Sequence, residues 1–118
     1  MTTDERRARL RRGRLAEMLA AVALMAKGYR IVGRNVRTRA GEIDIIAVRG
    51  KRLAFVEVKR RQTRDDVEAA IGWRQAARIR VAADYWLERR PRYQQHEQAF
   101  DLMLLVPRHW PPHIPDGL

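Results

Sequence analysis

The feature that most constrains the fold is the stretch from residue 42 to 59, which reads EIDIIAVRGKRLAFVEVK. Two runs rich in β-branched and aromatic residues, 41–48 and 53–59, flank the dipeptide Gly50-Lys51. Such runs are typical of β-strands, and glycine in the first of two turn positions favours a tight hairpin. We therefore expect two antiparallel strands whose register is set by this turn.

The expected register gathers four charged side chains on one face of the hairpin. Counting outward from the turn places Asp44 opposite Glu57. Two residues further along, Glu42 lies opposite Lys59. Because side chains alternate along a strand, all four project from the same side.

An aspartate directly opposite a glutamate destabilises a strand pair unless something compensates the charge. A divalent cation would do so, because Mg²⁺ takes carboxylate oxygens together with water and phosphate oxygens. Asp44 and Glu57 are therefore candidate metal ligands, with Lys59 beside the metal ion to orient a water or hold a phosphate oxygen. The alternative interpretation is a Glu42–Lys59 salt bridge on an open sheet face, with the other two carboxylates in solvent.

A further acidic residue interrupts an apolar helix. Residues 4–27 predict a helix that ends near Gly28, with a basic first part and an apolar second part. Glu17 is the only charge between residues 15 and 26, and we expect this second part to be buried on more than one side. Packed against the sheet, Glu17 would face the carboxylate pair; the alternative is a residue at the boundary of the core.

The remaining elements complete an α-β-β-β-α-β order. We expect a first strand over 29–37, a second long helix over 65–87, and a last, largely apolar strand over 99–106 that is buried on both faces. This order predicts an α/β fold with a central mixed sheet flanked by helices. Residues 1–106 are expected to form a single domain, and the proline-rich tail 107–118 to continue neither a sheet nor a helix.

Composition favours some partners over others. The 118 residues carry 25 Lys and Arg against 14 Asp and Glu, a formal net charge of +11. Such an excess favours nucleic acid as the partner, although biased codon usage would also give an arginine-rich chain. No apolar run approaches the roughly 18 residues that span a bilayer, so we expect no membrane association. The absence of cysteine is compatible with the cytoplasm, where we expect the protein.

Tryptophans and histidines add little to these expectations. Trp73, Trp86 and Trp110 have faces on which bases could stack, but core or loop-covering roles are favoured. The three histidines show no spacing that indicates a zinc site.

These motifs resemble the PD-(D/E)XK nuclease superfamily. More closely, the chain resembles the YraN-like family of small bacterial endonuclease-like proteins, which are similar to archaeal Holliday junction resolvases. The resemblance covers about residues 13–106. Its segments are GRLAE at 13–17, KGYRIV at 27–32, RNVR at 34–37, GEIDIIA at 41–47, FVEVKRR at 55–61 and FDLM at 100–103. It implies a restriction-endonuclease-like fold.

The resemblance also implies roles for single residues. The implied catalytic set is Glu17, Asp44, Glu57 and Lys59: two metal ligands (Asp44 and Glu57) for Mg²⁺ or Mn²⁺, the catalytic lysine, and the helix acid of resolvase-like members. Contacts to nucleic-acid phosphates are expected from Arg60, Arg61 and Arg64. The chain departs from the family pattern at Gln75, where a lysine is usual, and at Ala99, where an arginine is usual. A homodimer is implied as well.

Three functions remain open on the sequence alone. The first is a Mg²⁺-dependent nuclease that hydrolyses DNA phosphodiesters, including those at branched or junction structures, with Lys59 positioning or activating the attacking water. The alternative is a non-catalytic nucleic-acid-binding protein that keeps the nuclease fold. The third is a scaffold whose arginine-rich surface binds an acidic partner protein.

Overall fold

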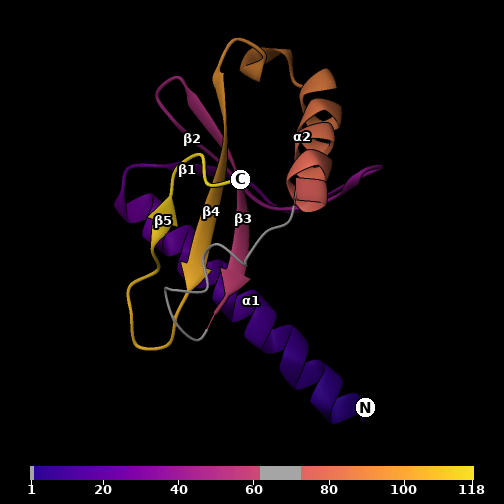
Figure 1. Ribbon diagram of the computed structural model, residues 1–118, viewed down its shortest axis with the longest axis vertical. Helices are drawn as coiled ribbons and strands as arrows, with labels where there is room; N and C mark the ends of the chain where they lie inside the picture. Colours follow the sequence, from indigo (N-terminus) through magenta and orange to yellow (C-terminus); the bar gives the residue numbers. More distant parts are fainter. Residues whose placement is uncertain (1, 62–72) are drawn as a thin grey trace.

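The computed structural model describes residues 2–61 and 73–118 (Figure 1). Its elements are α1 (Thr3–Ala26), β1 (Arg30–Thr38), β2 (Gly41–Arg49), β3 (Arg52–Arg60), α2 (Trp73–Glu88), the 3-10 turn η2 (Pro91–Tyr93), β4 (Glu97–Leu105) and β5 (His113–Ile114). The order confirms the expected α/β fold with a mixed sheet, and it is compatible with a restriction-endonuclease-like architecture. Residues 62–64 and the expected start of the second helix at 65 lie outside the described residues.

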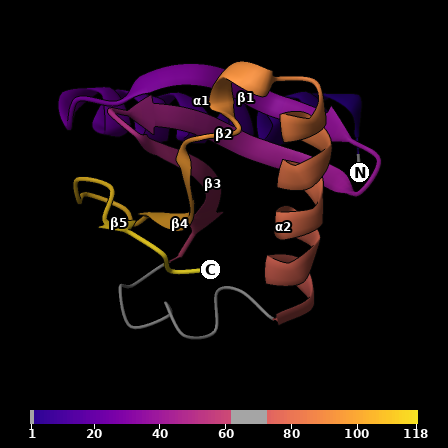
Figure 2. The same ribbon diagram turned by 90° about the horizontal axis from the view of Figure 1, so that it is seen from above.

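The five strands form one sheet in the order β1-β2-β3-β4-β5. The β1–β2 and β2–β3 pairs are antiparallel, β3 and β4 run parallel, and β5 returns antiparallel to β4. Helix α1 packs on one face of the sheet and α2 on the other (Figure 2). Since α2 precedes β4 in the chain and leads back to the sheet, it makes the crossover that a parallel strand pair requires.

The hairpin of β2 and β3 has the expected register near the turn, but the expected pairs Asp44–Glu57 and Glu42–Lys59 are not among the paired residues. Paired residues run from Arg49 opposite Arg52, next to the turn, to Ile45 opposite Val56. Gly50 has a φ of +59°, a conformation that glycine adopts without the steric penalty of a side chain. The turn thus specifies the register, and both strands are buried on both faces over most of their length.

Helix α1 begins and ends at clear signals. Thr2 and Glu5 form a reciprocal capping box, in which the Glu5 N–H donates to the Thr2 hydroxyl at 3.1 Å. At the other end Gly28 has a φ of +93°, and the Tyr29 N–H donates to the Leu24 carbonyl at 3.1 Å. The predicted end near Gly28 is confirmed.

The expectation that the apolar part of α1 is buried on more than one side is wrong. Only one face of the helix lies on the sheet, and its buried residues there are mostly alanines: Ala16, Ala20, Ala21, Ala23 and Leu24. The longer side chains Leu15, Met18, Leu19, Val22 and Met25 are exposed on the outer side. Small residues let the helix approach the sheet closely, while the longer side chains stay exposed.

The α2 side of the sheet holds the aromatic core. Phe55 of β3 meets Trp86 edge to face, with ring centroids 5.9 Å apart, and Trp86 also contacts Tyr93 of η2 at 5.4 Å. Trp86 is 4% exposed, which confirms the core role expected for it. Such aromatic contacts add to the burial of apolar area and hold η2 against the helix.

The tail does continue the sheet, contrary to expectation. His113 pairs with Met103 and Ile114 with Leu102, as strand β5. Prolines at 111, 112 and 115 confine this strand to two residues, but His113 and Ile114 keep the backbone N–H that a ladder needs. The tail is therefore short and still ordered by pairing.

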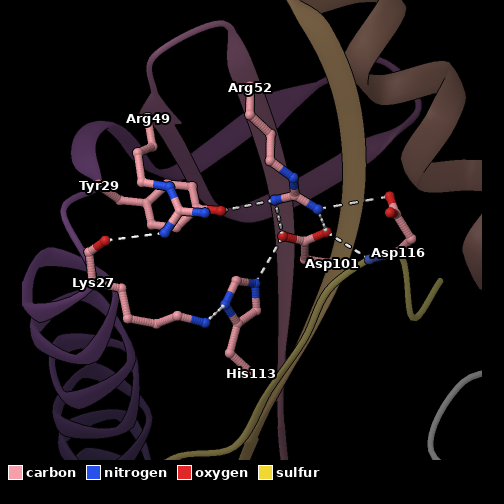
Figure 3. Close-up of polar contacts among 7 residues, drawn as sticks. All are labelled: Lys27, Tyr29, Arg49, Arg52, Asp101, His113 and Asp116. Atoms are coloured by element: carbon pink, nitrogen blue, oxygen red, sulfur yellow. Dashed lines mark hydrogen bonds and ion pairs between the residues drawn. The ribbon is translucent and has the colours of Figure 1, made fainter.

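Beneath β5 a polar network surrounds the buried Asp101 of β4 (Figure 3). Its carboxylate accepts two hydrogen bonds from Arg52, at 2.6 and 2.9 Å, and one from His113 Nε2 at 2.8 Å. The backbone N–H of Asp116 donates to it as well, at 2.8 Å. Burial acts to raise the pKa of Asp101, but these hydrogen bonds outweigh it and hold the pKa below its usual range. The network anchors the tail to the sheet.

Candidate metal centre

Asp44 marks the place where β2 and β3 stop pairing. The last backbone pair of this hairpin is Ile45 with Val56, one residue nearer the turn. Beyond it, the Asp44 Oδ2 atom accepts a hydrogen bond from the backbone N–H of Val58 at 2.8 Å. A side-chain oxygen thus takes the place of a ladder acceptor, and the carboxylate is held in the gap between the parting strands.

Three carboxylates converge at this gap. Glu17 from α1, and Glu42 and Asp44 from β2, each offer one oxygen, and these oxygens lie within 4.8 Å of one another. Glu17 and Asp44 are half-buried, whereas Glu42 is exposed, so the cluster remains open to solvent. Carboxylate oxygens at this spacing are the ligands that Mg²⁺ and Mn²⁺ prefer.

The electrostatics of the cluster agree with a cation site. Burial, followed by the negative charge of Glu57, raises the pKa of Asp44 to about 7, and Glu17 adds to the shift. The hydrogen bond from Val58 and the charge of Lys59 act in the opposite direction and do not cancel it. The site therefore disfavours the negative charge of Asp44 when no cation is bound, and a divalent cation fits this donor set.

Glu57 is held differently from the other acids. It is 6% exposed, and its Oε1 atom accepts a hydrogen bond from the Gln75 side chain at 2.8 Å. Lys59 Nζ lies 3.2 Å from the same oxygen. Glu57 is close enough to Asp44 to raise its pKa, but the three-carboxylate cluster forms with Glu42 instead.

The structure therefore brings the predicted site residues together in one region, in two groups. The first is the cluster of Glu17, Glu42 and Asp44, and the second is Glu57 with Lys59 and Gln75. Within the described residues the salt bridge of Lys59 is with Glu57, not with Glu42 as the alternative interpretation had it. The metal-ligand pair of Asp44 and Glu57 and the catalytic roles stay predictions.

Two of these residues were missed as members of the site. The sequence predicts Glu42 only as a partner of Lys59, although its place two residues before Asp44 on one strand is a usable signal. Gln75 stands out in the sequence only as a departure from a family lysine, whereas it contacts Glu57 directly. No local pattern could reveal that contact, because it joins α2 to β3.

The predicted phosphate-binding arginines follow directly after β3. Arg60 is exposed at the end of the strand, and Arg61 is half-buried and donates to the Arg60 carbonyl at 2.6 Å. Arg64 lies outside the described residues. The first two are thus next to Lys59 along the chain.

An α-β-β-β-α-β order with a mixed sheet, and acidic residues gathered where its central hairpin opens, defines a protein of the PD-(D/E)XK nuclease-like group. Residues 16–105 match the model of the family described as "Uncharacterised protein family UPF0102". The chain belongs to this family, which is the YraN-like family that its motifs resemble.

Relatives with high identity extend over nearly the whole chain. A UPF0102 protein of Mesorhizobium japonicum is 49% identical over 104 residues, which cover 88% of this chain and 83% of the relative. A UPF0102 protein of Rhizobium meliloti is 46% identical over 108 residues, covering 92% and 88%. One from Brucella canis is 45% identical over 112 residues, covering 95% and 89%. In the described part of the chain, no helix has the length and apolar character needed to cross a membrane.

Proposed function

We propose that this protein is a Mg²⁺- or Mn²⁺-dependent nuclease that hydrolyses DNA phosphodiesters, with branched or junction DNA as its substrate class. The observation that supports this most directly is the convergence of Glu17, Glu42 and Asp44 oxygens within 4.8 Å. Asp44 and Glu17 would hold the cation, with Glu42 or Glu57 completing the set. When bound, such a cation stabilises the charge that develops on the phosphate and activates water.

The second group of site residues, Glu57, Lys59 and Gln75, holds the positively charged ammonium of Lys59 in place. Lys59 is 25% exposed, so its ammonium can reach a phosphate oxygen or a water while it keeps its ion pair with Glu57. Glu57 pairs with the Lys59 ammonium, and Gln75 of α2 in turn holds the carboxylate of Glu57. A fixed donor costs little reorganisation when negative charge develops at the substrate. We assign to Lys59 the holding and orienting of the attacking water.

DNA as the substrate is supported by charge. The net charge of +11 attracts a polyanion, and Arg60 and Arg61 continue the chain directly from Lys59. A homodimer in the cytoplasm belongs to the same proposal, since two copies would present two sites to a branched substrate. Light scattering of the purified protein with and without a four-way junction measures the assembly.

A cleavage panel tests the proposal. Linear, flapped and four-way-junction DNA are incubated with the protein in Mg²⁺, Mn²⁺ and EDTA. We expect cleavage that needs a divalent cation and that is lost in Asp44→Asn. The matched control is Asp84→Asn, an exposed aspartate on the outer side of α2. Cleavage by Asp44→Asn at the wild-type rate, or equal cleavage in EDTA, would refute the proposal.

A non-catalytic DNA-binding role is the second candidate, and the observation that favours it is Gln75. Its neutral side-chain amide donates a hydrogen bond to Glu57, at a position where the family usually has a positively charged lysine. DNA binding that weakens steeply with salt, with no cleavage in any metal, would establish this role instead.

A further inference from the structure

A groove runs between α1 and the segment that follows β4. Its volume is about 720 Å³, and its walls include Leu15, Leu19 and Val22 of α1 on one side and Val106 and Trp110 on the other. Arg60, Arg61 and Arg108 line it as well. This volume falls in the range of roughly 300–1,000 Å³ that small-molecule sites occupy.

The groove has one large aromatic side chain at its edge. Trp110 is 66% exposed, in contrast to the buried Trp86. Leu15 and Leu19, opposite it on α1, are 57% and 58% exposed. An exposed tryptophan beside apolar side chains is a surface on which a nucleobase stacks, and stacking needs no particular base.

Positive charge accompanies this apolar surface. Arg60 and Arg108 are exposed in the lining of the groove. Arg108 has a φ of +65°, in a turn closed by a hydrogen bond from the His109 N–H to the Val106 carbonyl at 3.2 Å. This is the turn position where glycine is preferred, so an arginine is kept here at a conformational cost. At this groove the charge suits an anionic ligand better than a second copy of this basic chain.

Two residues of the groove are sequence neighbours of residues in the candidate metal centre. Ala16 lines the groove, and the next residue is Glu17 of the acidic cluster. Arg60 lines it too, and the residue before it is Lys59. Figure 1 shows the ends of β3 and β4 crossing the middle of α1 in this view. A DNA strand with a phosphate at the acidic cluster would pass directly into the groove.

We propose that this groove binds one or two unpaired nucleotides, with a base stacked on Trp110 and the adjoining phosphates on Arg60 and Arg108. The inference rests on the proposed function and narrows its substrate class. A base can reach Trp110 only if it is out of its pair. The substrate is then DNA with a single-stranded segment beside the scissile phosphate, such as a flap or an opened junction, and not continuous duplex.

Binding measured without metal tests this inference separately from cleavage. Labelled single-stranded oligo(dT), a flapped duplex and a blunt duplex are titrated in EDTA by fluorescence anisotropy. Trp110→Ala is expected to weaken oligo(dT) and flap binding about ten-fold or more and to leave blunt-duplex binding within two-fold. Trp110→Phe keeps a stacking ring and is expected to restore most of the affinity.

Arg108→Gly is the second variant, and it separates a phosphate contact from a folding defect. Glycine relieves the φ of +65°, so the melting temperature should stay the same or rise. The salt dependence of oligo(dT) binding should fall by about one counterion. Unchanged oligo(dT) affinity in both variants overturns the inference and leaves the groove to a protein partner. In that case loss of cleavage in Asp44→Asn would still support the nuclease.

Discussion

The carboxylate of Asp44 accepts a hydrogen bond from the backbone N–H of Val58 at 2.8 Å, at the point where β2 and β3 cease to pair. One side chain thus ends the ladder and becomes part of the acidic cluster. Burial and Glu57 raise its pKa to about 7, so its charged form is disfavoured without a cation. The effect of this buried carboxylate on the free energy of unfolding can be measured.

Asp44→Asn is expected to stabilise the protein in the absence of metal, by about 1–2 kcal/mol at pH 8, because it removes a buried charge and its repulsion with Glu57, while the amide oxygen still accepts from Val58. Millimolar Mg²⁺ or Mn²⁺ should raise the melting temperature of the wild type and not that of the variant. Thermal unfolding in EDTA and in metal, with Asp84→Asn as control, measures both the stability difference and the metal-induced shift of the melting temperature. An equal metal-induced shift in wild type and Asp44→Asn would contradict the site.

Lys59→Gln is expected to lower metal-dependent cleavage about 100-fold or more, because it removes the ammonium beside Glu57 without removing the acidic cluster. Single-turnover cleavage of a flapped substrate measures the rate. The matched control is Lys51→Gln, in the exposed turn of the hairpin, which should cleave at the wild-type rate. Equal rates for both variants would remove Lys59 from the mechanism.

Gln75→Glu is expected to destabilise the protein by about 1–2 kcal/mol near neutral pH, because it sets a carboxylate against Glu57 in place of a donor. Lysine is similar in length to glutamine and also donates hydrogen bonds, so the stability of Gln75→Lys should be at or above that of the wild type. Urea unfolding of the two variants makes the comparison. A similar loss of stability in both variants would show that the shape of the side chain at position 75, and not its hydrogen bond to Glu57, determines the stability.

The hairpin was the part of the fold that sequence predicts best. The turn at Gly50 and the apolar runs on either side specify one register, and that register is observed from Arg49–Arg52 to Ile45–Val56. The end of the pairing could not be predicted. It depends on a single side chain–backbone hydrogen bond, which leaves no trace in the pattern of apolar and polar residues.

The outer side of α1 and strand β5 mark the other limits of prediction. When nearly every position of a helix is apolar, the periodicity of the sequence does not show which face packs on the sheet. In α1 the alanines alone indicate that face. A two-residue strand between prolines has too few residues for any alternation to show. Its partner Asp101 lies in the FDLM segment, but only the fold brings His113 and Arg52 to it.

The Asp101 network should make the protein sensitive to acid. The pKa of Asp101 is lower in the folded than in the unfolded state, so the unfolded state binds more protons as the pH falls below about 4. The contribution of Asp101 to stability is therefore present above that pH and lost progressively below it. Urea unfolding between pH 2.5 and 7 measures the slope.

Asp101→Asn should flatten this acid slope and destabilise the protein at pH 7 by about 3 kcal/mol, because Arg52 loses the charge it pairs with. Asp116→Asn is the control. Its side chain is largely exposed and lies 3.7 Å from Arg52, so the change should cost little and keep the wild-type slope. An unchanged slope in Asp101→Asn would assign the acid sensitivity to another carboxylate.

Trp86 and Trp110 should differ sharply in their contribution to folding. Trp86→Ala is expected to cost about 3–5 kcal/mol, because it opens a cavity against Phe55 and Tyr93. Trp110→Ala should change the free energy of unfolding by no more than about 0.5 kcal/mol, because the side chain is exposed. Chemical unfolding of the two variants tests the contrast, and a large loss in Trp110→Ala would show a structural role for it.

The parallel pairing of β3 with β4 has a consequence for biosynthesis. Arg52 pairs with Glu97, so the neighbour of β3 on that side is translated long after β3 itself. Until then, the buried run Leu53 to Val56 forms the open edge of a three-stranded sheet on the nascent chain. Unpaired apolar edges recruit strands from other molecules. A truncated chain that stops at residue 61 should therefore aggregate. Ribosome-associated chaperones should bind the incomplete three-stranded sheet on the nascent chain.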